Sequence, residues 1–227
     1  EGMGVYKLDM NKCILERYIS ANYQSYNEMN GDNINDVFVD ESKRIWLANY
    51  PTGITVIDYR YENYHWMKHS MGNKQSIVND QVHAVIEDSD GDLWFGTSNG
   101  ISLYNSGTGE WHSFLSSFNH QLKDKNHIFI TLCEVSPGII WAGGYTSGIY
   151  KINKADLSVE YFSPYLLSHI NMRPDKYIRD MIKDSKGHIW SGGYYNLKCF
   201  DLATNSVRLY PGVSSITAIA EKDSHNM

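Results

Sequence analysis

Four tryptophans recur along the chain at nearly constant intervals of 48, 47 and 49 residues. Each follows an Ile or a Leu, and the four are Trp46, Trp94, Trp141 and Trp190. Six residues earlier stands Asp40, Asp88, Val135 or Asp184, and six or seven residues later stands Gly53, Gly100, Gly148 or Asn196, residue types that tolerate positive φ. A fixed period of this length restricts the fold to repeat architectures, in which each repeat buries its apolar surface against the next.

One repeat, residues 81–115, contains four short segments of alternating apolar and polar residues, VHAVIED, LWFGT, ISLYN and WHSFL. Clusters of Gly, Asn, Asp and Ser separate them, which is typical of half-buried strands joined by tight hairpins. Asp88, which opens the first of these turns, is interpreted as a turn residue that accepts backbone hydrogen bonds. Four antiparallel strands with a period in the forties predict an all-β fold, the β-propeller.

The ends of the chain suggest that this propeller is incomplete. GVYKLD at 4–9 matches GIYKIN at 148–153, so residues 1–20 are predicted to be the last two strands of a blade, and 216–227 the first strand of another. Between them, four whole blades are expected at 35–70, 81–115, 128–163 and 178–211. Because the second strand is missing at both ends, we expect residues 1–227 to form one partial, open propeller domain, part of a larger, seven-bladed ring.

Composition excludes several classes of function. Hydrophobic residues make up 42% of the chain and charged residues 20%, as in a folded globular domain. The formal net charge of −6 provides no basic surface for nucleic acid. No apolar run approaches the roughly 20 residues of a membrane helix. Cys13, Cys133 and Cys199 are too far apart for a zinc site and are interpreted as buried thiols.

No motif points to catalysis, a metal or a cofactor. The sequence contains no zinc-protease, phosphate-loop, nucleophile-elbow or dinucleotide signature, so no catalytic residue is predicted. The segment DSDGD at 88–92 resembles the start of a calcium loop, but Leu93 and Asn99 stand where that loop needs Gly and Glu. It is interpreted as a hairpin turn.

The amino-acid sequence of the repeats narrows the protein family more than their period does. VIEDSDGDLWFGTSNGISLYN and MIKDSKGHIWSGGYYNLKCFD resemble the regulator-propeller repeat of the sensor regions of bacterial hybrid two-component systems. The resemblance spans residues 35–211, with departures at Lys43, Val135 and Asn196. It implies a non-catalytic, periplasmic sensor module that detects a carbohydrate or oligosaccharide. It also implies a histidine kinase elsewhere in a dimeric full-length protein.

Tyrosines gather in the loops of one blade face, while the phased tryptophans are expected to pack between blades. The connections from second to third strand and from blade to blade, at 21–35, 70–81, 116–127 and 164–177, share that face. Aromatic rings beside polar donors suit a sugar. The expected ligand residues are Tyr50, Tyr145, Tyr194, Tyr195 and Arg173.

Two other functions stay open. A propeller enzyme acting on polysaccharide, either a hydrolase or a lyase, would need two inward-facing carboxylates on the loop face. A protein-interaction scaffold would show a broad apolar patch there instead of a polar pocket.

Overall fold

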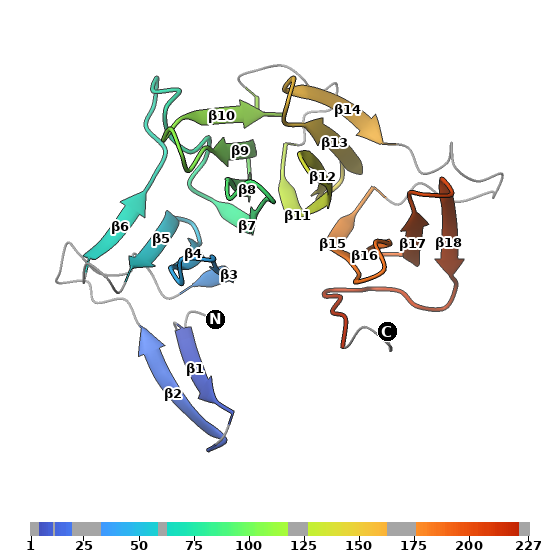
Figure 1. Cartoon of the computed structure of the whole chain (residues 1–227), viewed down its shortest axis with the longest axis horizontal. Coiled ribbons are helices and arrows are strands. Elements are labelled where there is room, and N and C mark those ends of the chain that lie inside the picture. Colours follow the sequence, from blue (N-terminus) through green and yellow to red (C-terminus); the bar gives the residue numbers. More distant parts are fainter. Residues whose placement is uncertain are drawn as a thin grey trace.

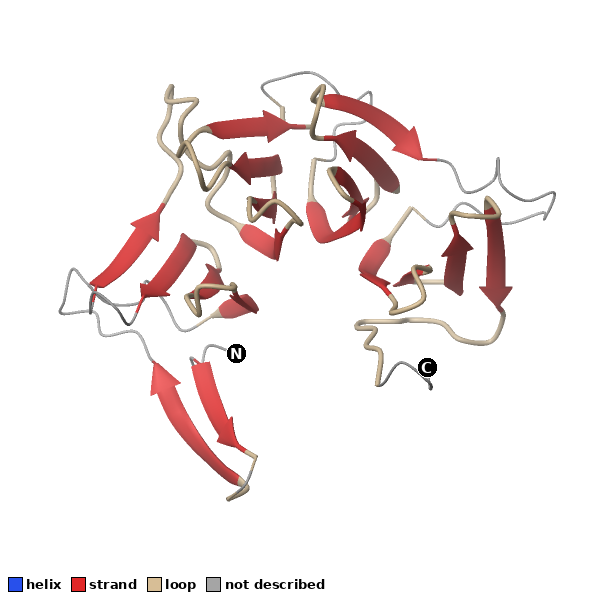
Figure 2. Cartoon of the chain, in the orientation of Figure 1, coloured by secondary structure: helices blue, strands red, loops and turns tan. Residues whose placement is uncertain are grey.

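The computed structural model describes residues 5–10, 12–19, 33–58, 63–117, 127–162 and 176–222. In these ranges the regular elements are β-strands, arranged in one two-stranded and four four-stranded antiparallel sheets (Figure 1). The sheets stand side by side along an open arc, and the first and last segments of the chain lie at its two ends (Figure 2). The prediction of an all-β, partial propeller is confirmed.

Each blade is formed by four strands that are consecutive in sequence and adjacent in the sheet. The N-terminal hairpin consists of β1 (Val5–Asp9) and β2 (Ile14–Ile19). Blade 1 consists of β3 (Ile34–Val39), β4 (Ile45–Asn49), β5 (Gly53–Asp58) and β6 (Asn63–Met67). Blade 2 consists of β7 (Val82–Glu87), β8 (Leu93–Thr97), β9 (Gly100–Tyr104) and β10 (Trp111–Phe114). Blade 3 consists of β11 (Phe129–Ser136), β12 (Ile139–Gly144), β13 (Ile149–Asn153) and β14 (Ser158–Phe162). Blade 4 consists of β15 (Ile178–Lys183), β16 (Ile189–Gly193), β17 (Leu197–Asp201) and β18 (Ser206–Tyr210).

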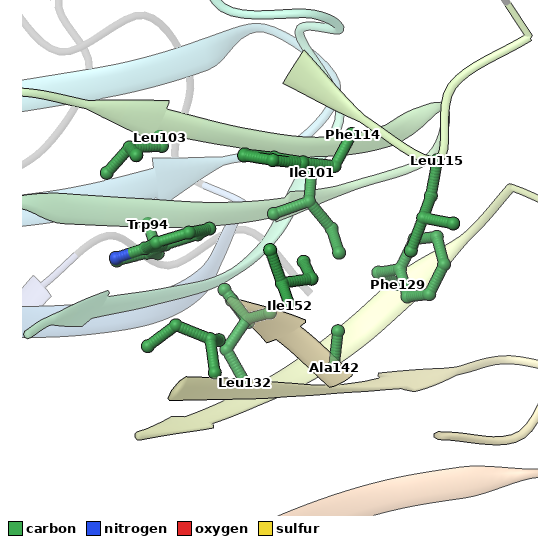
Figure 3. Packing of buried hydrophobic residues seen from close by; sticks show 11 residues of the cluster. Trp94, Ile101, Leu103, Phe114, Leu115, Phe129, Leu132, Ala142 and Ile152 are labelled. Carbon is green, nitrogen blue, oxygen red and sulfur yellow. The ribbon is translucent and has the colours of Figure 1, made fainter. Parts of the chain in front are cut away.

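The blades pack against one another through apolar clusters. The cluster between blades 2 and 3 includes Trp94, Ile101, Leu132 and Ile152 (Figure 3). Equivalent clusters surround Trp46 between blades 1 and 2, and Trp141 between blades 3 and 4. The second strands of blades 1, 2 and 3 therefore each supply a large ring to the space between sheets, where its burial stabilises the stack.

The four phased tryptophans are buried, and three of them are hydrogen-bonded to the acid six residues earlier. The indole Nε1 donates from Trp46 to Asp40 at 3.0 Å, from Trp94 to Asp88 at 2.8 Å and from Trp190 to Asp184 at 2.9 Å. The same Asp88 carboxylate accepts the backbone N–H groups of Asp90 and Asp92. The acid thus holds the turn and also satisfies the buried indole. In blade 3 Val135 replaces it, and no residue in the described ranges bonds the Trp141 indole.

The departures from the repeat pattern have different structural outcomes. Lys43 takes the place of the turn glycine and adopts a φ of 66°, the left-handed conformation that Gly91 adopts at 83°. Asn196 stands where the other repeats have Gly53, Gly100 and Gly148, but unlike these glycines it does not adopt a positive φ. The turn before β17 therefore differs in conformation from its equivalents.

The residue two positions after each tryptophan is small, because the first strand of the next blade lies against it. These residues are Ala48, Gly96, Gly143 and Gly192. A Cβ atom on Gly143 would lie 2.6 Å from Cγ2 of Ile178, and one on Gly96 would lie 2.8 Å from the carbonyl oxygen of Phe129. Such distances are too short for any side chain, so these positions set how closely two blades approach.

Residues 216–222 follow blade 4 in the register of a first strand, although no strand is assigned to them. A Cβ on Gly192 would lie 2.5 Å from Ile216, just as one on Gly143 would meet Ile178. Ser185 donates to Glu221 through its backbone N–H and hydroxyl at 2.8 and 2.7 Å. Ser89 makes the same pair of bonds to Glu134 of blade 3. The rest of the predicted strand, 223–227, lies outside the described residues.

Candidate functional site

A cavity of about 440 Å³ lies where the first strands of the blades converge. Its lining comes from β3, β7, β11, β15 and residues 217–218, with polar groups at Asn35, Asp36, His83, Thr131, Arg179, Asp180 and Thr217. A volume of this size is typical of small-molecule sites. The cavity is therefore the candidate ligand site.

A β-bulge near the start of every first strand directs side chains into this cavity. The pairing register shifts between Ile34 and Asp36, Val82 and Ala84, Phe129 and Thr131, and Ile178 and Asp180. The extra residues are Asn35, His83, Ile130 and Arg179, and all four line the cavity. Bulges re-aim side chains beside functional sites, and here they do so at the same repeat position in each blade.

In blades 1, 3 and 4 the residue after the bulge links its blade to the segment that follows it. Asp36 accepts the N–H of Val85 at 3.1 Å, and Asp180 accepts the N–H of Ile219 at 2.6 Å. Thr131 accepts the N–H of Met181 at 3.1 Å in the same way. These hydrogen bonds are called the clasps below. Blade 2 carries Ala84 at this position, and a methyl group cannot form one.

Asp36 and Asp180 are inward-facing carboxylates, the feature that a propeller enzyme would need. Each also accepts the N–H of the residue after it, Val37 or Met181, so both oxygens of both groups are hydrogen-bonded to the backbone. Burial raises the pKa of Asp36, and the charge of Asp180 adds to the effect. Burial raises the pKa of Asp180 likewise, opposed by its backbone hydrogen bonds. The structure gives both acids a role in blade packing.

His83 is held in a neutral hydrogen-bonded network. Its Nε2 lies 2.8 Å from the hydroxyl of Ser98 and its Nδ1 lies 3.5 Å from the amide nitrogen of Asn35, which also donates to the Val82 carbonyl. An amide nitrogen only donates, so this arrangement assigns the ring proton to Nε2. Burial and the nearby charge of Arg179 lower the pKa of His83. At neutral pH the ring is therefore uncharged.

None of the four predicted tyrosines lines the cavity, but two of them are hydrogen-bonded through the backbone next to strands that do. Tyr50 and Tyr145 donate their backbone N–H groups, each at 2.9 Å, to the carbonyls of Asn33 and Ile128. Both acceptors stand two residues before a bulge residue, about 7 Å along a strand. The Tyr50 ring lies 6.5 Å from that of His83, which does line the cavity.

On blades 3 and 4 four exposed or half-buried rings form a continuous tyrosine row: Tyr145, Tyr177, Tyr194 and Tyr195. Successive ring centroids are 5.1, 5.6 and 6.0 Å apart. Sequence reasoning missed Tyr177, although it stands at the loop end of a predicted first strand. Arg173 lies outside the described residues, as does most of the loops 21–35, 116–127 and 164–177.

The acidic turn at 88–92 surrounds a lysine of the neighbouring blade. Nζ of Lys154, in the turn between β13 and β14, lies 2.7 Å from Asp88, 2.8 Å from Asp90 and 2.9 Å from Asp92. Burial opposes the charge of Lys154, but its hydrogen bonds to the three acids raise its pKa well above the usual value. The turn is therefore a structural link between blades 2 and 3, called the lysine link below. No cluster of metal-binding side chains occurs in the part of the chain that the structure describes.

Repeated four-stranded sheets around a common channel define a β-propeller. Comparisons with known proteins indicate which kind of propeller this chain resembles. Residues 76–99 match the two component regulator propeller family, which confirms the resemblance of the repeats. No curated protein matches the chain. No helix in the described ranges is long and apolar enough to cross a membrane.

Solved structures show the same fold. The extracellular domain of a putative hybrid two component system from B. thetaiotaomicron matches with a TM-score of 0.71 and 20% identity, over 86% of this chain and 26% of that chain. A second such domain from B. thetaiotaomicron matches with a TM-score of 0.55 and 16% identity, over 86% and 22%. Virginiamycin B lyase from Staphylococcus aureus matches with a TM-score of 0.60 and 13% identity, over 79% and 55%. The chain thus corresponds to a fraction of larger propeller proteins.

Proposed function

We propose that this chain is part of the extracytoplasmic, periplasmic sensor of a hybrid two-component signalling protein and that it binds carbohydrate. The regulator-propeller repeat at 76–99 and the fold of the hybrid two component domains support the sensor role. The observation that carries the ligand class is the polar cavity together with the exposed tyrosines of the loops between second and third strands. Aromatic faces stack on the C–H face of a sugar ring, and fixed polar groups select its hydroxyls.

Signalling would follow from the coupling of this site to the remainder of the protein. A ligand shifts a conformational equilibrium only by its difference in affinity for the two states. In the proposed mechanism, the saccharide binds one arrangement of a sensor dimer more tightly than another and so changes the activity of a histidine kinase encoded elsewhere in the same polypeptide. This chain has no catalytic role in that scheme.

Calorimetric titration of this chain with neutral and acidic oligosaccharides tests the proposal. Tyr145→Ala should weaken binding, because it removes a ring from the tyrosine row. Tyr161→Ala is the matched control, since Tyr161 has 45% of its surface exposed, against 46% for Tyr145, but lies on the outer strand β14. Equal weakening by both variants, or no binding of any saccharide by the parent, would refute carbohydrate recognition at this face.

A polysaccharide-cleaving enzyme is the second candidate, favoured by one observation. Asp36 and Asp180 both line the cavity, and burial raises the pKa of each. Incubating an acidic oligosaccharide with the parent and with Asp36→Asn, then separating products by chromatography, distinguishes the two functions. Cleavage by the parent that is lost in the variant would establish the enzyme. Unchanged substrate is expected for the sensor.

A further inference from the structure

Arg179 is the one residue among the four bulge positions with a full charge. Its side chain is exposed and lines the cavity. Within the described ranges it makes neither a hydrogen bond nor an ion pair, whereas Asn35 and His83 both do. A guanidinium presents five N–H donors in a rigid planar fork. The cavity therefore contains unused donor capacity, concentrated at β15.

The neighbouring acids do not use that capacity, because they are already engaged. Asp180, the next residue, directs its two oxygens to the N–H groups of Met181 and Ile219. Asp36, across the cavity, directs its oxygens to Val37 and Val85. An incoming cation would have to compete with these backbone donors. A ligand with hydrogen-bond acceptors can instead bind the N–H groups of Arg179 without displacing another partner.

The guanidinium of Arg179 itself favours an anion over a neutral acceptor. His83 is the other titratable base among the residues that line the cavity, and because it is neutral it neither repels Arg179 strongly nor competes for an anion. Charge-assisted hydrogen bonds from Arg to carboxylate or sulfate are shorter and stronger than those between neutral groups, and the fork geometry binds two oxygens at once. Asp36 and Asp180 repel such an anion, which limits the affinity to modest values.

The tyrosine row places an aromatic platform at the same end of β15. Tyr177 stands two residues before Arg179, about 7 Å along the strand, and its ring contacts both Tyr145 and Tyr194. A ligand held by Arg179 can therefore extend from the cavity over these rings.

We propose that the cavity binds an acidic oligosaccharide, with a carboxylate or sulfate on Arg179 and an adjoining sugar ring on the tyrosine row. This inference rests on the proposed carbohydrate-sensing function and specifies its ligand class. It assigns the anion to Arg179 of β15 and to no residue of the loop 164–177.

Titration calorimetry of this chain at low ionic strength tests the assignment with four probes. They are trigalacturonate, its methyl ester, a sulfated galactotriose and neutral galactotriose. At least one anionic probe should bind. Arg179→Met should weaken that binding about tenfold or more, Arg179→Lys should restore part of it, and the methyl ester should bind the parent as weakly as the anion binds the variant.

Arg208→Met is the matched control, because it removes the same charge from the exposed face of β18 in the same blade. Its affinity should equal that of the parent, and melting curves of all variants verify folding. Equal binding of the anion to Arg179→Met overturns the site. Binding of neutral galactotriose alone overturns the acidic ligand class but preserves carbohydrate sensing, and absence of binding to all four probes overturns both.

Discussion

Replacing Lys154 with Met should destabilise the protein strongly. The lysine link joins blades 2 and 3, and no clasp joins this pair of blades. Its ammonium group lies within 2.9 Å of three carboxylates, and its side chain is 15% exposed, against 0% for Asp88. Removing one partner of a buried ion pair costs about 3 to 5 kcal/mol. Asp88 keeps its bonds from the Trp94 indole and the turn, and Asp90 is exposed, so we expect about 2 to 4 kcal/mol of destabilisation.

Thermal and urea unfolding at neutral pH measure this loss, which corresponds to roughly 5 to 15 °C in melting temperature for a domain of this size. Lys186→Met serves as the control, since Lys186 is an exposed lysine in a turn of blade 4, between β15 and β16. A double-mutant cycle with Asp88→Asn isolates the pairwise energy. A Lys154→Met protein that melts with the Lys186→Met control would refute the reasoning, and so would a coupling energy of zero.

Three further outcomes follow from packing and titration. Trp94→Ala should cost about 3 to 5 kcal/mol, because it empties a fully buried site between two blades, and an unchanged melting temperature would contradict that role. Gly143→Ala should cost about 1 to 3 kcal/mol through its clash with Ile178, whereas Gly107→Ala in an open turn should cost little; equal melting temperatures would contradict the close approach. Burial opposes the ionised form of Asp184, but hydrogen bonds from Trp190 and His188 hold its pKa below the usual value. Its contribution is therefore complete above a pH of about 4 and lost as the pH falls through the lower folded-state pKa, so Asp184→Asn should lower the melting temperature at neutral pH and approach the parent in acid.

The tryptophan register was enough to predict the blades, since it reports a spacing that only stacked units of equal size maintain. It also placed Asp88 correctly in a turn. The hydrogen bond that the indole donates to that acid was missed, although the constant separation of six residues is its signature. The small residue two positions after each tryptophan was a second unused signal, since it marks a position where the next blade approaches too closely for a side chain.

The candidate site was less predictable, because it depends on an irregularity that a simple alternating pattern hides. A bulge shifts the register of a strand by one residue, so Arg179 reads as an ordinary exposed strand residue in the sequence. Loop composition identified Tyr145 and Tyr194, which the structure brings into one row with Tyr177. It could not identify the cavity, since the cavity is lined by first strands and not by loops.

The segment 216–222 shows that a first strand is positioned by the blade before it, without hydrogen bonds to a second strand of its own. Ile216 against Gly192, the Ile219 N–H on Asp180 and Glu221 on Ser185 fix its register through side chains already in place. During synthesis a chain emerges from the ribosome N-terminus first, and folding proceeds in that order. Each finished blade can therefore serve as a template for the next, so that the ring grows by one correctly aligned strand at a time.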